Sequence, residues 1–141
     1  MTAVAFRYLL DTNAISALAR QPQGAVAARI RELGEETVCT SIVVACELRF
    51  GLLKRGSPRL SERVEAILDV LPVLPLEPPG DVDYAAIRHA LETAGAPIGP
   101  NDLLIAAHAR SLGLTVVTAN IREFSRVPGL NVELWDTPNK A

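Results

Sequence analysis

The sequence predicts an α/β fold with a central parallel sheet, organised as a single domain over residues 1–141. Short apolar runs, such as 4–10 and 114–118, have the length and composition of buried strands. Each run is followed by a longer segment whose apolar residues recur at helical spacing, and this alternation is typical of parallel strands joined by crossover helices. With 49% hydrophobic and 21% charged residues, a chain of this length can bury one core.

The first half of the chain is predicted to contain two strands and four helices. The strands are 4–10 and 37–40, and the helices are 13–20, 25–33, 41–53 and a fourth that begins at Pro58. Ser41 can cap the third helix. The fourth helix has an apolar stripe that we assign to the core, with the stripe also available for partner contacts: Leu60, Val64, Ile67, Leu68 and Leu71.

The second half begins with the proline-rich stretch 71–80, which we interpret as an extended connection with a short strand at its start. A domain boundary there would leave two halves of about 70 residues, each marginal for a core. Gly113 is expected to end a helix, and Trp135 is assigned to the core. The remaining predicted elements are helices 81–93 and 101–112 and strands 114–118 and 132–135.

Composition narrows the class of protein. The net charge of −2 indicates neither a dedicated nucleic-acid binder nor a membrane-surface protein, although it excludes neither. Arg7 and Asp11 interrupt the only N-terminal apolar run, so no signal peptide is predicted, and no run is long enough to span a membrane. Cys39 and Cys46 fit no zinc spacing and are interpreted as small buried residues in a reducing compartment. We therefore expect a soluble, cytoplasmic domain.

Asp11 ends the first apolar run, within the stretch LLDTN of residues 9–13. One interpretation is that Asp11 or Asn13 caps the next helix. The other is that Asp11 points into a crevice at the carboxyl end of a strand, where open α/β sheets bind their ligands. The choice depends on whether other carboxylates reach the same place.

Two further acids lie beside apolar helical neighbours. Glu47 has valines three and four positions before it and Phe50 three positions after it, so it shares a helical face with apolar residues. A charge on such a face requires a partner, and the simplest structural alternative is a salt bridge to an arginine. Asp102 has Ile105 and Ala106 on its side of the helix, although an acid in a first helical turn also suits the helix dipole.

Asp11, Glu47 and Asp102 all follow or begin elements that should meet at the carboxyl edge of a parallel sheet. Three carboxylates placed together repel one another, and a divalent cation resolves that conflict. All-oxygen ligands suit Mg²⁺ or Mn²⁺. Because the sequence has no P-loop, no GxGxxG and no nucleophile with a partnered histidine, metal-assisted phosphodiester hydrolysis is the chemistry that this pattern favours.

Four segments carry a resemblance to a known family: LLDTN (9–13), VVACELRFG (43–51), PIGPNDLLIAAHARSLGL (97–114) and VVTANIREFSRVPGL (116–130). In order and spacing they resemble the motifs of PIN-domain ribonucleases, and the nearest resemblance is to the VapC-type toxins of bacterial toxin–antitoxin pairs. The resemblance covers nearly the whole chain. It implies a PIN-like α/β/α sandwich and a Mg²⁺-dependent endoribonuclease that cleaves structured RNA, either tRNA or rRNA.

The resemblance also implies roles for individual residues. Asp11, Glu47 and Asp102 match the acidic metal ligands of the family. Asn120 stands where many PIN domains have a fourth acid, with Glu123 three residues further on, and this departure leaves one metal ion rather than two as the expectation. Polar residues at matching positions are expected to support the site through hydrogen bonds: Thr12, Asn13, Ser41, Thr118 and Glu123. The family further implies a homodimer and a VapB-type antitoxin as partner.

Two groups of basic residues are candidates for binding the RNA backbone, against the alternative of ordinary surface charge. The first comprises Arg49, Lys54, Arg55, Arg59 and Arg63, and the second Arg110, Arg122 and Arg126. His108 shares its helical face with apolar residues and is interpreted as a core histidine rather than a general base. Two rival functions remain: a housekeeping RNA-processing PIN nuclease, and a PIN-like module that binds RNA or a partner without cleaving.

Overall fold

A parallel sheet forms the centre of this computed structural model, which describes residues 5–136. The strand order is β3-β2-β1-β4-β5, and every pairing is parallel. The first strand therefore lies in the middle, with Leu9 opposite Cys39 on one side and Val116 on the other. The strands are β1 (Tyr8–Leu10), β2 (Val38–Ser41), β3 (Val73–Leu74), β4 (Thr115–Val117) and β5 (Val132–Glu133).

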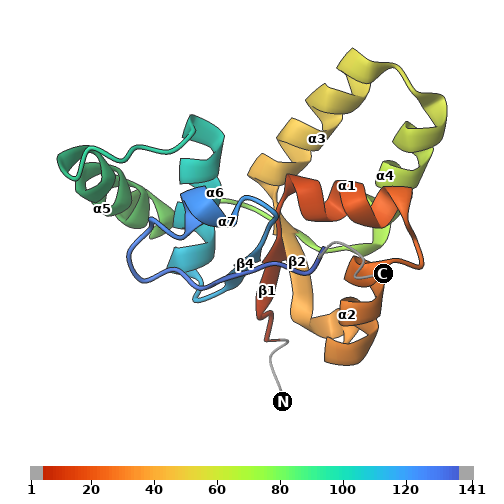
Figure 1. Cartoon of the computed structure of the whole chain (residues 1–141), viewed down its shortest axis with the longest axis horizontal. Coiled ribbons are helices and arrows are strands. Elements are labelled where there is room, and N and C mark those ends of the chain that lie inside the picture. Colours follow the sequence, from red (N-terminus) through yellow and green to blue (C-terminus); the bar gives the residue numbers. More distant parts are fainter. Residues whose placement is uncertain (1–4, 137–141) are drawn as a thin grey trace.

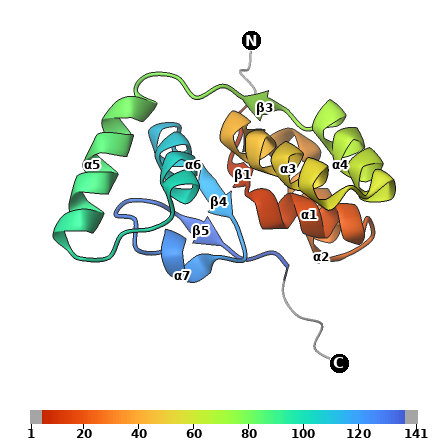
Figure 2. The same cartoon turned by 90° about the horizontal axis from the view of Figure 1, so that it is seen from above.

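Helices cover both faces of the sheet, so the predicted α/β/α sandwich is confirmed. Figures 1 and 2 show α1 to α4 on one side of the strands and α5 to α7 on the other. The first set is α1 (Thr12–Arg20), α2 (Ala25–Leu33), α3 (Ile42–Arg55) and α4 (Pro58–Val70). The second set is α5 (Gly80–Thr93), α6 (Pro100–Ser111) and α7 (Ile121–Phe124), and a 3₁₀ turn, Glu35–Thr37, precedes β2.

The predicted elements agree with the structure in type and differ at their ends. The first strand was expected at 4–10 but is observed from Tyr8, and Val4 lies outside the described residues. Thr37 belongs to the 3₁₀ turn, so β2 begins one residue later than expected. The predicted stop after α6 is confirmed, because Gly113 has a positive φ of 70° that favours glycine. The short helix α7 was not predicted.

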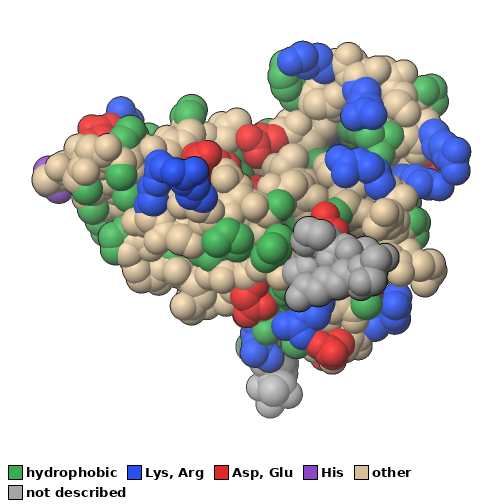
Figure 3. Space-filling model, viewed as in Figure 1, with side chains coloured by type: hydrophobic (Ala, Val, Ile, Leu, Met, Phe, Trp, Pro, Cys, Tyr) green, Lys and Arg blue, Asp and Glu red, His purple; other side chains and the backbone are tan. Residues whose placement is uncertain are grey.

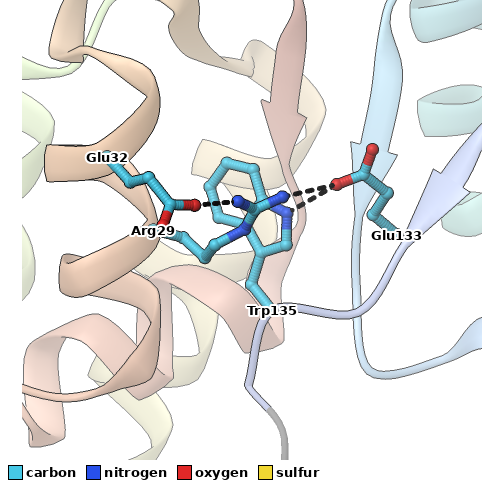
Figure 4. Close-up of polar contacts among 4 residues, drawn as sticks. All are labelled: Arg29, Glu32, Glu133 and Trp135. Atoms are coloured by element: carbon cyan, nitrogen blue, oxygen red, sulfur yellow. Dashed lines mark hydrogen bonds and ion pairs between the residues drawn. The ribbon is translucent and has the colours of Figure 1, made fainter.

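Trp135 holds the end of the described chain against the core, as predicted. It is only 4% exposed, and its ring lies 5.0 Å from that of Tyr8 in β1. Its indole N–H donates to Glu133 at 2.9 Å, and the Arg29 guanidinium lies over the ring at 5.7 Å while pairing with Glu32 and Glu133 (Figure 4). This cluster ties α2 and the segment after β5 to the central strand. None of the helices in residues 5–136 combines the length and hydrophobicity that a bilayer crossing requires.

Candidate active site

A cleft of about 910 Å³ opens at the carboxyl edge of the sheet, between the two helical layers. Figure 3 shows acidic side chains in this hollow, while Lys and Arg gather over α3, α4 and the end of α1. Asp11, Glu47, Asp102 and Asn120 all line the cleft, so the four principal residues predicted from the sequence lie in one place. The other lining residues are Thr12, Asn13, Ser16, Arg20, Ile42, Val43, Cys46, Phe50, Asn101 and Leu104.

Asp11 forms the floor of the cleft and is almost fully buried, with 3% of its surface exposed. It occupies the N-cap position of α1, but its side chain makes no capping hydrogen bond. One carboxylate oxygen, Oδ2, accepts a hydrogen bond of 2.8 Å from the Thr118 hydroxyl, while the other, Oδ1, is buried without a partner. Burial raises the pKa of Asp11, and the nearby Glu47 adds to the rise. An unpartnered oxygen on a buried acid is costly, and a bound ligand is the usual reason for one.

The turn after β4 fixes Thr118 beneath Asp11. The Thr118 oxygen accepts hydrogen bonds from the backbone N–H of Asn120 at 2.9 Å and from the Asn13 amide at 3.3 Å. Asn13 in turn accepts from the backbone N–H of Ala119 at 2.7 Å. Because these bonds fill the acceptor sites of Thr118, its hydroxyl proton is directed at Asp11. Thr118 and Asn13 thus lie where a supporting role requires them.

Glu47 extends from α3 across the mouth of the cleft. Its two oxygens accept hydrogen bonds from the Thr12 hydroxyl at 2.7 Å and from the Asn101 amide at 2.9 Å. No arginine pairs with Glu47 among residues 5–136, so the alternative explanation of a salt bridge was wrong there. The apolar face on which Glu47 lies borders the cleft rather than the core, since Phe50 is 65% exposed.

Asp102 lies in the first turn of α6, opposite Asp11. Its Oδ2 atom accepts a hydrogen bond of 3.1 Å from the Asn120 amide. Burial, with the added repulsion of Asp11, Glu123 and Glu47, raises the pKa of Asp102 from its ordinary value of 3.8 to about 6. Glu123 also accepts a hydrogen bond of 3.3 Å from the backbone N–H of Gly99, the residue that precedes α6.

Ser41 lies behind the cleft rather than on its wall. It caps α3 by accepting a hydrogen bond of 3.0 Å from the Val43 N–H, as predicted, and its hydroxyl lies 2.7 Å from Nδ1 of His108. Both residues are buried, with His108 1% exposed. Burial lowers the pKa of His108. The interpretation of His108 as a core histidine is confirmed, and it links α6 to the start of α3.

Three residues that line the cleft were not selected from the sequence: Ser16, Arg20 and Asn101. Thr12, Ser16 and Arg20 recur every four positions along α1 and so share one helical face. That spacing was the available signal. For Asn101 only its position beside Asp102 marked it. Cys46 is a correction: it is exposed at the cleft rather than buried, because it lies on the same outward face of α3 as Phe50.

The candidate RNA-binding arginines divide into paired and unpaired groups. Arg49 pairs with Glu65 at 2.8 Å, and Arg110 pairs with Asp83 at 2.6 Å, so both have counter-charges. Lys54, Arg55, Arg59, Arg63, Arg122 and Arg126 form no ion pair within residues 5–136.

The acids of the cleft also lack a protein counter-charge. No Lys, Arg or His side chain in the described part of the chain pairs with Asp11, Glu47 or Asp102. Within the same residues, no three Asp, Glu, His or Cys side chains lie close enough to hold one ion jointly. Glu47 is directed toward Thr12 and Asn101, which leaves Asp11 and Asp102 as the acids that face the cleft without a positive partner.

Comparison with known proteins identifies the family. The family model described as "PIN domain" matches residues 8–130, which include every residue of the cleft. The chain belongs to the PIN domain family. Among curated relatives, the tRNA(fMet)-specific endonuclease VapC of Salmonella typhimurium is 37% identical, over 92% of this chain and 98% of that protein. Ribonuclease VapC2 of Haemophilus influenzae is also 37% identical with the same coverage. This PIN domain is therefore an endoribonuclease of the VapC type.

Solved structures agree with this assignment. A chain in the crystal structure of VapBC2 from Rickettsia felis, bound to a DNA fragment from its promoter, matches with a TM-score of 0.83 and 32% identity. The match covers 93% of this chain and 100% of that chain. DNA-bound VapBC from Salmonella typhimurium matches with a TM-score of 0.82 and 34% identity, over 92% and 98% of the two chains. The resemblance seen in the sequence motifs is thereby confirmed at the level of the family.

Proposed function

We propose that this VapC-type ribonuclease is a Mg²⁺-dependent toxin that cleaves structured RNA, with tRNA as the first substrate to test and rRNA as the second. The carrying observation is the buried Oδ1 atom of Asp11, which has no hydrogen-bond partner and lies in a cleft of acids without a protein cation. The Salmonella typhimurium relative is named as a tRNA(fMet)-specific endonuclease, which supports tRNA.

The donor set fits Mg²⁺, or Mn²⁺ in its place. Asp11 and Asp102 would hold the ion, and Glu47 would contribute through metal-bound water, since Mg²⁺ usually takes one or two carboxylates and keeps several waters. When bound, the ion supplies an activated water and neutralises charge at the scissile phosphate. Asn120 presents an amide where a further acid would favour a second ion, which supports a single metal site.

The surrounding polar residues hold the acids in position. Thr118 directs Asp11 and Asn120 directs Asp102, through hydrogen bonds of 2.8 and 3.1 Å. Thr12 and Asn101 fix Glu47 from two different helices. Such supporting contacts typically change metal affinity or activity by about 10- to 100-fold when removed. The raised pKa of Asp102 means that metal binding displaces a proton in mildly acidic solution.

RNA cleavage by the purified protein, free of any partner, tests the proposal. Total bacterial RNA would be incubated at low salt with Mg²⁺, Mn²⁺ or EDTA, and new 5′ ends mapped. We expect a few discrete cuts that require metal and disappear in Asp11→Asn and Asp102→Asn. Asp69→Asn is the matched control, because Asp69 is exposed on α4 and makes the same chemical change outside the cleft. If the wild type and the Asp11 and Asp102 variants give one pattern, or if metal binds and nothing is cut, the catalytic proposal is wrong and a binding module replaces it.

We also propose a VapB-type antitoxin and a second copy of the chain as partners. The solved relatives named VapBC support the first partner. For the second, α3 exposes Ile42, Phe50 and Leu53 on its surface, with 44%, 65% and 85% of each exposed, and such apolar side chains favour a protein contact. Light scattering of the wild type and of a Phe50→Ser/Leu53→Ser variant tests the dimer, with Val82→Ser on α5 as control. A wild type with the mass of one chain would contradict it. A neighbouring antitoxin reading frame would separate a toxin from a housekeeping enzyme.

A further inference from the structure

A second, smaller cavity adjoins the acidic cleft at the outer end of α1. It has a volume of about 330 Å³ and is lined by Arg20, Ser57, Arg59, Leu60 and Arg63. Arg20 lines both this cavity and the acidic cleft. The two hollows are therefore continuous along the surface, with Arg20 at their junction.

The chain builds this cavity from the end of one helix and the start of another. Arg20 is the last residue of α1, and α4 begins at Pro58 with Ser57 as its cap. The two helices pack together, and Arg63 of α4 donates a hydrogen bond of 3.2 Å to the Ala19 carbonyl of α1. The arginines thus converge from two elements held by the fold, rather than from a loop.

The three arginines of the cavity carry uncompensated positive charge. Arg20, Arg59 and Arg63 form no ion pair within residues 5–136. Elsewhere in this part of the chain, Arg29, Arg49, Arg88 and Arg110 each have a carboxylate partner. Like charges drawn to one cavity repel one another, and an anionic ligand removes that cost. Figure 3 shows basic side chains gathered over this region, beside the acidic hollow.

We infer that the cavity of Arg20, Arg59 and Arg63 is a phosphate-binding subsite for the RNA backbone, one that places the scissile phosphate over the acids. This inference rests on the proposed RNA substrate. An RNA strand with one phosphate at Asp11 and Asp102 leaves the cleft past Arg20, and its neighbouring phosphates then meet Arg59 and Arg63. The guanidinium group binds phosphate oxygens through paired N–H donors, and such contacts position a nucleic acid without reading its bases.

Continuity with the cleft favours RNA over an acidic protein as the ligand. Carboxylates at the floor of the cleft repel the polyanion that the enzyme cleaves, so binding energy must come from cations beside the floor. The arginine cavity supplies that energy at one end only. The subsite therefore predicts binding that is strongly salt-dependent and indifferent to base sequence at this position.

Binding of labelled bulk bacterial tRNA, measured by fluorescence anisotropy over a series of KCl concentrations, tests the subsite. The cleavage-deficient Asp102→Asn protein in EDTA is the background, into which Arg20→Gln, Arg59→Gln and Arg63→Gln are introduced singly and together. Arg31→Gln is the matched control, because Arg31 is an exposed arginine on α2 with no ion pair in the described residues. Each subsite variant should bind about three- to tenfold more weakly at low salt and should reduce the slope of log affinity against log salt by about 0.7 to 0.9.

Further arms decide between the outcomes. Arg→Lys variants retain the charge and should recover part of the affinity. Melting curves identify any loss of fold, and Arg59 makes no hydrogen bond to its own chain, so its variant stays informative. Unchanged tRNA binding, or the same loss in Arg31→Gln, overturns the subsite. Weaker binding of polyglutamate with unchanged binding of tRNA overturns it in favour of an acidic protein. Cleavage by the wild type is scored separately, so a protein that cuts RNA without using these arginines refutes the subsite alone.

Discussion

Replacing Asp102 with asparagine should make the metal-free protein more stable while removing its activity. The folded state raises the pKa of Asp102 from 3.8 to about 6, first by burial and then by repulsion from Asp11, Glu123 and Glu47. Between about pH 4 and 6 the folded chain therefore holds a proton that the unfolded chain releases. Since stability falls with pH wherever the native state binds more protons, the free energy of unfolding declines through this window and stays lowered above it.

The size of the effect follows from the shift. The full rise in pKa corresponds to about 3 kcal/mol at neutral pH. Asp102 is partly exposed, and discounting for solvent screening leaves about 1 to 2 kcal/mol. Asparagine keeps an oxygen that can accept from Asn120, so the hydrogen bond at this position survives the change. For a domain of this size the melting temperature should rise by about 3 to 8 °C.

Thermal unfolding in EDTA measures this directly. Wild type, Asp102→Asn and the exposed control Asp69→Asn would be compared at pH 7.5 and again near pH 4.5. The gain from Asp102→Asn should be largest at pH 7.5 and small near pH 4.5, while Asp69→Asn should follow the wild type at both. Adding Mg²⁺ should raise the melting temperature of the wild type more than that of Asp102→Asn. A variant that melts at or below the wild-type temperature at pH 7.5 would show that the site does not strain the fold.

Three other measurements follow from the contacts of the site. Thr118→Val removes the donor to Asp11, so cleavage should need more Mg²⁺ and fall by about 10- to 100-fold; an unchanged Mg²⁺ dependence would count against a supporting role. Ser41→Ala removes the cap of α3 and unpairs buried His108, which should cost about 1 to 3 kcal/mol in urea unfolding, against about 1 kcal/mol for the capping loss alone in Ser57→Ala; equal losses would mean that the His108 contact contributes nothing. Burial raises the pKa of the Cys39 thiol to about 12, so iodoacetamide should label only exposed Cys46 in the native protein, and mass spectrometry showing modified Cys39 would contradict the fold around β2.

The pattern of the sequence reached the fold because strand and helix periods are local properties. Long periodic segments such as α2 and α4 were predicted almost to the residue. The helix α7 was missed because its four residues are too few to show a helical period. The strand ends differ because hydrogen bonding to a neighbouring strand, rather than hydrophobicity, decides where a strand ends.

The site was reached in part, and for Glu47 the reasoning differs from the structure. An acid among valines and Phe50 indicated a buried charge, whereas the structure shows an apolar face that borders the cleft. The selection of Glu47 agreed with the cleft because an unusual neighbourhood marks a functional surface as well as a core. Its partners Thr12 and Asn101 lie 35 and 54 residues away, and no local pattern connects them.

Arg20 shows a different limit. Its charge is ordinary at the end of a helix, where a basic residue suits the dipole. Only the packing of α1 on α4 makes it the link between the acidic cleft and the arginine cavity. Conversely, Arg49 and Arg110 looked free in the sequence but have carboxylate partners in the structure. Which arginines are free for a ligand is a property of the tertiary fold.

The central place of the first strand has a consequence during protein synthesis. Asp11 depends on Thr118, which follows it by 107 residues, and β1 has only one neighbour until β4 is made. At about 5 to 20 residues per second, a ribosome carries the chain for about 5 to 20 s between these two residues. During that interval the growing chain has Asp11 and Glu47 but no wall formed by Asn120. A nascent or prematurely terminated chain therefore cannot cut the RNAs of the ribosome that is making it.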